Sequence, residues 1–153
     1  SDFALVDSEG VSLPDSEWPH SQHNPQWTDG PTGPGGRVLL YDNGNGIGRS
    51  RVVEYDVDLG TKTVTQLWSW TEPDWFNPTL GDADRLPDGL VLITQGFNRA
   101  RTPESTDHSE LVELDPPNDV VWRLSFNDPQ WPVYRAQRID GCELFANTRF
   151  CDR

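Results

Sequence analysis

A pattern that occurs nearly three times constrains this chain more than any other feature of its sequence. Each copy has an Asp-Gly turn, a hydrophobic strand, a loop and a second strand that reads Ser-x-Φ-Val-Glu-Φ-Asp, where Φ is apolar. Asp29-Gly30 precedes the motif at residues 50–56 by 21 residues, and Asp88-Gly89 precedes residues 109–115 by the same interval, so the copies are 59 residues apart. A third copy opens at residues 136–141. A period of roughly 50 residues with about four short strands is typical of a β-propeller blade.

The repeat predicts an all-β chain with blades of four antiparallel strands, about ten strands in all, packed face to face without a long helix. Blades are expected at about residues 20–70, 81–126 and 134–153, the last one partial. Residues 1–19 could complete the last strand of a preceding blade. Closed propellers have about four to eight blades, and the chain holds about 2.5 to 3. Because no Met occurs even at position 1, we expect residues 1–153 to be the C-terminal part of a larger propeller. Its remainder, or another chain, would cover the exposed blade faces.

The charge balance argues against two classes of partner. The formal net charge is -13 and the isoelectric point is about 4.4, and Lys62 is the only lysine against eleven arginines. Such a field repels nucleic acid and anionic membranes. No apolar stretch approaches the ~20 residues that span a bilayer. Adaptation to high salt and a solvated acidic surface that reflects coding bias both stay open as explanations of the charge.

Two cysteines stand near the end of the chain. If Ala146-Asn147 is a two-residue hairpin turn, Cys142 and Cys151 fall opposite each other at a Cα separation of ~4.5 Å, which suits a disulfide. A disulfide would place the protein in an oxidising compartment, whereas two reduced thiols are the alternative. The spacing lacks the second Cys or His pair of a zinc site, and we expect neither a metal nor a cofactor.

Strand direction predicts which polar residues share one end of the molecule. If the Asp-Gly turns join the first and second strands of each blade, the starts of the innermost strands all lie on the opposite face. The equivalent positions on the three innermost strands are His23, Asp82 and Arg135. We expect them to converge at the mouth of the channel, with Arg51 and His108 entering from neighbouring loops. A histidine beside arginines can attack an electrophilic anion or hydrogen-bond it.

A simpler interpretation stands beside the catalytic one. A histidine that points into a polar channel often only satisfies neighbouring hydrogen-bonding groups, and Arg51 could pair with Glu54 or Asp56 on its own strand.

The chain resembles a known family in several segments between about residues 20 and 141. These segments are Gln22-His23-Asn24, Leu39-Leu40-Tyr41-Asp42-Asn43-Gly44, Ser50-Arg51-Val52-Val53-Glu54-Tyr55-Asp56, the stretch from Gly81 to Gly89, and Tyr134-Arg135-Ala136. As a set, they resemble the C-terminal blades of the arylsulfate sulfotransferase family.

The resemblance implies a secreted or periplasmic propeller that moves a sulfuryl group from a phenolic ester to another phenol without a nucleotide donor. It implies a ping-pong mechanism in which a channel histidine becomes a transient sulfohistidine while other histidines and an arginine hold the sulfate oxygens. His23 matches a channel histidine of the family, and Arg51 matches the arginine of its Ser-Arg motif. An arginine fork suits the charge on sulfate oxygens, and an imidazole is both a nucleophile and a proton carrier near neutral pH.

The leading hypothesis is therefore sulfuryl transfer between small phenols and aryl sulfates. His23 and His108 are the candidate nucleophile and acid-base pair, and Arg51 is the candidate sulfate clamp. The first alternative is a non-catalytic extracellular module that binds an aromatic or sulfated ligand, and the second is a purely structural propeller segment. The candidate substrate-binding residues are Asp82, Arg135, Tyr134, Arg99, Trp75 and Trp131.

Overall fold

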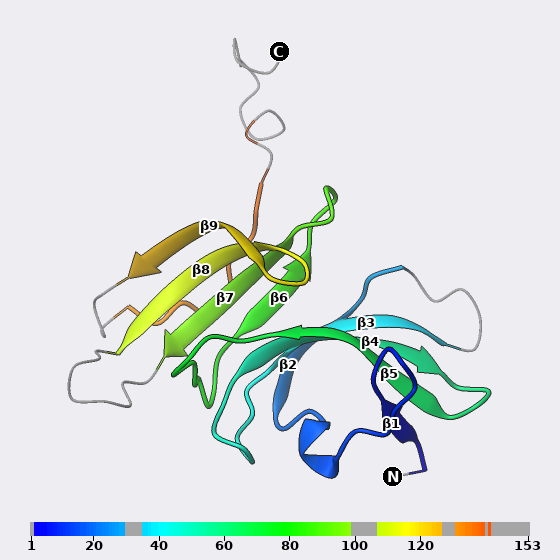
Figure 1. Cartoon of the computed structure of the whole chain (residues 1–153). Helices are drawn as coiled ribbons and strands as arrows, with labels where there is room; N and C mark the ends of the chain where they lie inside the picture. Colours follow the sequence, from blue (N-terminus) through cyan, green and yellow to red (C-terminus); the bar gives the residue numbers. More distant parts are fainter. Residues whose placement is uncertain (1, 30–34, 99–106, 127–130, 140, 142–153) are drawn as a thin grey trace.

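Strands dominate the structure. The computed structural model of the chain describes residues 2–29, 35–98, 107–126, 131–139 and 141. These ranges contain nine strands and one 3-10 turn, η1 (Asp15–Glu17). The strands are β1 (Ala4–Val6), β2 (Gln22–Trp27), β3 (Gly35–Asp42), β4 (Arg51–Asp58), β5 (Thr63–Trp70), β6 (Asp82–Arg85), β7 (Val91–Asn98), β8 (His108–Asp115) and β9 (Asp119–Phe126). The all-β prediction is confirmed, and the strands form two sheets (Figure 1).

The first sheet has five strands in the order β1-β5-β4-β3-β2. Strands β2 to β5 pair antiparallel in chain order, but β1 pairs parallel with β5, and Ala4 lies opposite Thr63. The expectation that residues 1–19 complete a preceding blade is therefore wrong for β1. This strand instead pairs with the backbone groups that β5 would otherwise leave open at a sheet edge.

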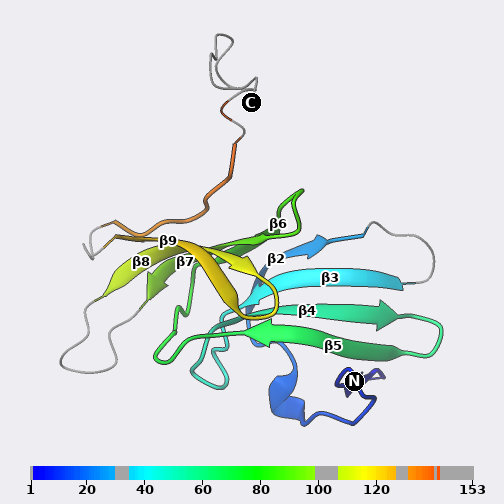
Figure 2. The same ribbon diagram turned by 45° about the horizontal axis from the view of Figure 1, so that its top comes forward.

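The second sheet has four strands in the order β6-β7-β8-β9, and all of them pair antiparallel. The turn at Asp88-Gly89 joins β6 to β7, and Gly89 has a φ of +92°, which a residue without a Cβ adopts at little cost. The first strands of the two sheets, β2 and β6, lie side by side (Figures 1 and 2). Residues that begin these two strands are therefore neighbours although they are far apart in the sequence.

The main hydrophobic core lies between the two sheets. Trp70 and Trp75 meet there edge to face, with ring centroids 4.7 Å apart and an interplanar angle of 87°. The alternation of side chains along a strand sends every second residue to this face. The buried members of the core are Leu39, Tyr41, Val52, Trp70, Trp75, Ala83, Val91, Ile93, Val112 and Leu114.

A second core lies on the other face of the first sheet. Its buried members are Leu5, Leu40, Val53, Tyr55 and Val64. The N-terminal segment covers this face with side chains that pack against the cluster, among them Phe3, Leu13 and Trp18. The first sheet is therefore apolar on both faces, because a different part of the chain covers each.

The serine of the repeated strand motif has the same structural role in both copies. Ser50 Oγ donates to the backbone oxygens of Asn43 (3.0 Å) and Asn77 (3.3 Å). Ser109 Oγ donates to the oxygens of Gly96 (2.6 Å) and Trp131 (3.0 Å). Ser50 thus ties the loop before β4 to the segment that follows β5, and Ser109 ties the end of β7 to the segment at Trp131. A small donor suits this position in both copies.

The glutamate of the motif forms an ion pair that also occurs in both copies. Glu54 faces the second sheet, and its Oε2 accepts from Arg85 Nη2 of β6 at 2.8 Å and from Trp68 Nε1 at 2.7 Å. One copy further on, Arg138 Nη1 lies 3.6 Å from Glu113 Oε2. A glutamate of one copy therefore faces an arginine at the start of the next copy.

Residues 131–139 continue along the second sheet. Val133 N donates to Gly96 O at 2.9 Å, and Ala136 N donates to Thr94 Oγ1 at 3.2 Å. They carry no assigned strand. The greater part of the third copy, including Cys142 and Cys151 with their predicted disulfide, lies outside the described residues.

Candidate functional site

His23 lies on β2, directly opposite Tyr41 of β3. Directly opposed residues share one face of a sheet, and Tyr41 belongs to the core between the sheets, so His23 also faces the second sheet. Its ring is half-buried, and Nδ1 lies 2.5 Å from Asn43 Oδ1. The Tyr41 hydroxyl donates to Gln95, and burial raises the pKa of Tyr41 well above its usual range. The phenol of Tyr41 therefore stays protonated and donates to Gln95.

A β-bulge directly follows His23. The register of β2 with β3 shifts between His23 and Gln26, and Asn24 has a φ of +44°, a left-handed conformation that asparagine tolerates better than most residues. Bulges re-aim side chains, and here Asn24 reaches the second sheet. Asn24 Nδ2 donates to Asp84 Oδ1 at 3.1 Å, and its Oδ1 accepts from Arg135 Nη2 at 3.0 Å.

Asp82 begins β6 and meets Arg135. Arg135 Nε lies 2.8 Å from Asp82 Oδ2, with side-chain exposures of 56 % for the arginine and 2 % for the aspartate. Burial, followed by the charge of Asp84, raises the pKa of Asp82, and Arg135 opposes this shift. The strand starts close against β3, since a Cβ added to Gly81, whose φ is +146°, would lie 2.3 Å from the Tyr41 ring. Only glycine allows this approach without a shift of the neighbouring ring.

We call these residues the strand-start cluster: His23, Asn24, Asp82, Asp84 and Arg135.

The structure does not bring Arg51 to the strand-start cluster. Arg51 pairs in register with Asp42, one position along β3 from the partner of His23, so it faces the opposite side of the sheet. Its Nε donates to Asp42 Oδ2 at 3.1 Å, its Nη2 donates to Glu17 O at 2.7 Å, and its Nη1 pairs with the Glu17 carboxylate. With an exposure of 1 %, this guanidinium is committed to a buried network and offers no open fork to a sulfate.

His108 also lies apart from the cluster. It begins β8, and β7 separates this strand from β6, which carries Asp82. Its Nε2 is 3.8 Å from Glu110 Oε1. The geometry therefore links His23 to Arg135 through the adjacent Asn24, and it leaves His108 two strands away from β6.

The aromatic candidates divide by burial. Trp75 is 2 % exposed and packs on Trp70, so the structure places it in the core rather than on a surface that an aromatic ligand could reach. Trp131 and Tyr134 are 66 % and 69 % exposed, and they precede Arg135 in the segment of residues 131–139 along the second sheet. Arg99 lies outside the described residues.

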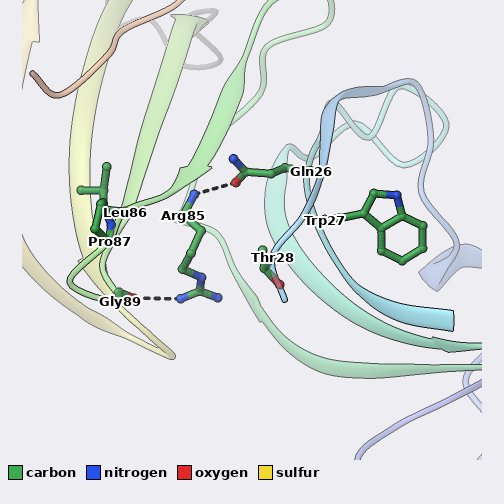
Figure 3. A pocket seen from close by; sticks show the side chains of 7 residues that line it. All are labelled: Gln26, Trp27, Thr28, Arg85, Leu86, Pro87 and Gly89. Atoms are coloured by element: carbon green, nitrogen blue, oxygen red, sulfur yellow. Dashed lines mark hydrogen bonds between the residues drawn. The ribbon is translucent and has the colours of Figure 1, made fainter. Parts of the chain in front are cut away.

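A cleft of about 450 Å³ opens at the other end of the first strands, near the Asp88-Gly89 turn. Figure 3 shows Arg85 across it, where its backbone N donates to Gln26 Oε1 at 2.8 Å and its Nη1 donates to Gly89 O at 2.9 Å. The arginine therefore links the two sheets and the turn, and the cleft is distinct from the strand-start cluster. It is lined by Gln26, Trp27, Thr28, Arg85, Leu86, Pro87 and Gly89.

Three residues that take part in the site, Asn24, Asn43 and Asp84, were not among the predicted site residues. Asp84 lies two residues after Asp82 on β6 and accepts from Asn24. Asn24 reaches the cluster through a bulge, and the signal in the sequence is the proline that follows it inside a strand, which marks an irregularity. Asn43 meets His23 from the loop after β3. Its signal is the Asp42-Asn43-Gly44 run, to which we gave no role beyond the family resemblance.

The described residues contain no group of three His, Cys, Asp or Glu side chains that could hold a metal ion. Within the same ranges, no helix is long and apolar enough to cross a membrane. The chemistry available at the strand-start cluster is thus that of an imidazole, a guanidinium and two carboxylates.

Comparison with known proteins agrees with the resemblance read from the sequence. The family model described as Arylsulfotransferase (ASST) matches residues 3–135, which include both sheets and the strand-start cluster. No match was found among curated proteins. The family indicates a transferase of the aryl sulfotransfer type, and its model covers most of the chain. The chain belongs to the arylsulfotransferase (ASST) family.

Proposed function

We propose that this protein transfers a sulfuryl group from a phenolic sulfate ester to a phenol acceptor through an intermediate on His23. The observation that carries the proposal is the position of a half-buried imidazole at the start of a first strand. The neighbouring residue, Asn24, contacts a half-exposed arginine, Arg135. A nucleophile next to a cation that solvent can reach is what a sulfate ester needs.

The reaction balances in two steps. A ring nitrogen of His23 attacks the sulfur, the bond from sulfur to the first phenolic oxygen breaks, and its electron pair leaves with the phenolate. A second phenol then attacks the same sulfur and loses its proton while the N–S bond breaks. The proton that the acceptor phenol loses equals the proton that the first phenolate takes up, so the overall reaction conserves protons. Arg135, rather than the buried Arg51, is the arginine we assign to the sulfate oxygens.

The exposed aromatic residues near Arg135 suit a phenolic substrate. Trp131 and Tyr134 offer exposed ring surface in the segment that leads to Arg135, and aromatic faces bind aromatic rings by stacking. This also keeps open the alternative of a non-catalytic module that binds aromatic or sulfated ligands.

We propose further that the two sheets are successive blades of a β-propeller that acts in a secreted or periplasmic location. The support is the 59-residue repeat and the edge strand β9, which exposes apolar side chains at Val120, Val121, Trp122 and Leu124. A further copy of the repeat, in the same or another chain, would cover this side.

A single-turnover measurement tests the function. The full-length protein is mixed with 4-nitrophenyl sulfate without an acceptor, and a burst of nitrophenolate equal to the enzyme concentration is expected. Mass spectrometry should then find one SO3 group on the peptide that contains His23.

Two variants separate the histidines. His23→Ala should abolish the burst, whereas His108→Ala should retain it. A burst that survives in His23→Ala would refute the assignment. If the wild-type protein binds aryl sulfate but releases no phenolate, the protein is a non-catalytic binding module and the proposed enzymatic function is refuted.

A further inference from the structure

Asn43 is held in one orientation. Its side chain is fully buried, and its Nδ2 donates to the backbone oxygens of Asn77 (2.6 Å) and Leu80 (2.8 Å). A carbonyl oxygen only accepts hydrogen bonds, so the group that faces these two oxygens must be the NH2 of the amide. The remaining atom, Oδ1, is therefore the one that faces His23.

The orientation of this amide decides where His23 carries its proton. Asn43 Oδ1 lies 2.5 Å from His23 Nδ1, and an amide oxygen can only accept, so Nδ1 must be the N–H donor. A neutral imidazole has one N–H. The lone pair that can act as a nucleophile is consequently on Nε2.

We propose that Asn43 is a positioning residue that fixes His23 in the Nδ1–H tautomer and so presents Nε2 to the sulfuryl donor. This inference rests on the proposed function for its catalytic meaning, but the tautomer itself does not depend on that function. Attack by Nε2 leaves Nδ1–H in place, so the ring becomes a cation while it carries the SO3 group. The hydrogen bond to Asn43 then becomes charge-assisted and stronger, which stabilises the charge that develops in both half-reactions.

Hydrogen bonds of Ser50, Asp42 and Arg51 hold the loop that carries Asn43. Ser50 Oγ donates to Asn43 O at 3.0 Å and accepts from Asn77 N at 2.8 Å. Asp42 Oδ1 accepts from the backbone N of Gly44 at 3.0 Å, and Asp42 Oδ2 accepts from Arg51 at 3.1 Å. The Ser-Arg motif thus supports the position of Asn43 from the adjacent strand.

Nitrogen NMR of the chain labelled with ¹⁵N-histidine tests the proposal directly. His23→Gln identifies the His23 signals by their loss. In the wild-type protein at a pH where the ring is neutral, we expect Nδ1 to show the protonated signal and Nε2 the unprotonated one. A wild-type spectrum with the proton on Nε2 overturns the proposal, and this result does not depend on any substitution of Asn43.

Variants connect the tautomer to turnover. Asn43→Ala should give His23 signals averaged between both tautomers and should lower kcat by about 10- to 100-fold, the effect of one hydrogen bond to a charged group. Asn43→Asp keeps an acceptor toward Nδ1 but loses the donors to Asn77 O and Leu80 O. It should lower stability, recover the Nδ1–H tautomer and move the acidic limb of the pH–rate profile to higher pH. The matched control is Asn45→Ala on the same loop, whose side chain donates to Pro78 O at 3.0 Å. It should change neither the tautomer of His23 nor kcat.

The two proposals fail in different ways. If Asn43→Ala keeps the Nδ1–H tautomer, the positioning role is refuted whatever the activity. If the wild-type tautomer is as expected but no phenolate burst occurs, the proposed sulfuryl transfer is refuted, whereas the orientation of the His23 ring by Asn43 stands.

Discussion

The ion pair between the sheets gives a stability prediction that can be worked out from the structure. Arg85→Ala removes the guanidinium that donates to Glu54 Oε2 at 2.8 Å. The Glu54 side chain is 6 % exposed, and among the described residues its carboxylate keeps the hydrogen bonds from Thr28 Oγ1 (2.9 Å) and Trp68 Nε1 (2.7 Å). The variant therefore leaves a buried charge with fewer partners.

The magnitude follows from the exposure of the two partners. Removing one partner of a fully buried ion pair costs about 3–5 kcal/mol, but Arg85 is 21 % exposed, so water partly replaces it. A hydrogen bond to a charged group contributes about 1.5–3 kcal/mol. Arg85 also lies over the Trp68 ring at 5.8 Å, a cation–π contact of about 0.5–1 kcal/mol. We expect the free energy of unfolding to fall by about 2–3 kcal/mol.

Urea unfolding followed by tryptophan fluorescence measures this change. The control is Arg37→Ala, because Arg37 Nε lies 3.8 Å from Asp29 Oδ2 and the side chains are 55 % and 49 % exposed. Such a surface pair should contribute about 0–0.5 kcal/mol. A double-mutant cycle of Arg85→Ala with Glu54→Gln isolates the coupling energy. Equal losses for the two arginine variants, or a coupling energy near zero, would refute the reasoning.

Three further predictions concern the site and its supports. Gly81→Ala should lower the free energy of unfolding by about 2–3 kcal/mol through overpacking, against about 1 kcal/mol for Gly10→Ala, whose added Cβ meets no atom within 4 Å. Equal losses in urea unfolding would contradict this. Arg51→Met should cost at least ~3 kcal/mol because it leaves the Asp42 carboxylate buried and unpaired, and an unchanged Tm by circular dichroism would disprove it. Because burial raises the pKa of Asp82 above 3.8, its stabilising contribution is complete below pH 3.8 and is lost as the pH rises through the folded pKa. Asp82→Asn should therefore gain stability relative to wild type as the pH rises from that point, and the opposite slope in urea titrations would exclude this.

The repeat predicts those features that depend on local signals. The strand and turn pattern follows from Asp-Gly turns and alternating apolar residues, and the structure confirms the all-β class. The repeat offset also matches Asp82 with Arg135, which lie 2.8 Å apart. Equivalent positions of neighbouring copies meet because each first strand packs beside the next.

Features that depend on which face of a sheet meets which neighbour could not be predicted from the sequence. Val52 and Val53 are both apolar and buried, so alternation along β4 does not say which face meets the second sheet, and the side taken by Arg51 stays undetermined. The burial of Trp75 could not be predicted for the same reason, since its packing on Trp70 is what places it in the core. The parallel pairing of β1 depends on a contact more than 50 residues away in the chain.

Consecutive residues at the end of β3 connect the buried arginine to the proposed nucleophile. Asp42 holds Arg51 on one face of the sheet, and Asn43 contacts His23 on the other. The Arg51 network can therefore influence the site without touching a substrate, because it fixes the backbone from which Asn43 projects. On this basis Arg51→Met should reduce stability and the tautomer preference of His23 together, whereas His23→Ala should remove the transfer activity and leave the Asp42–Arg51 network intact.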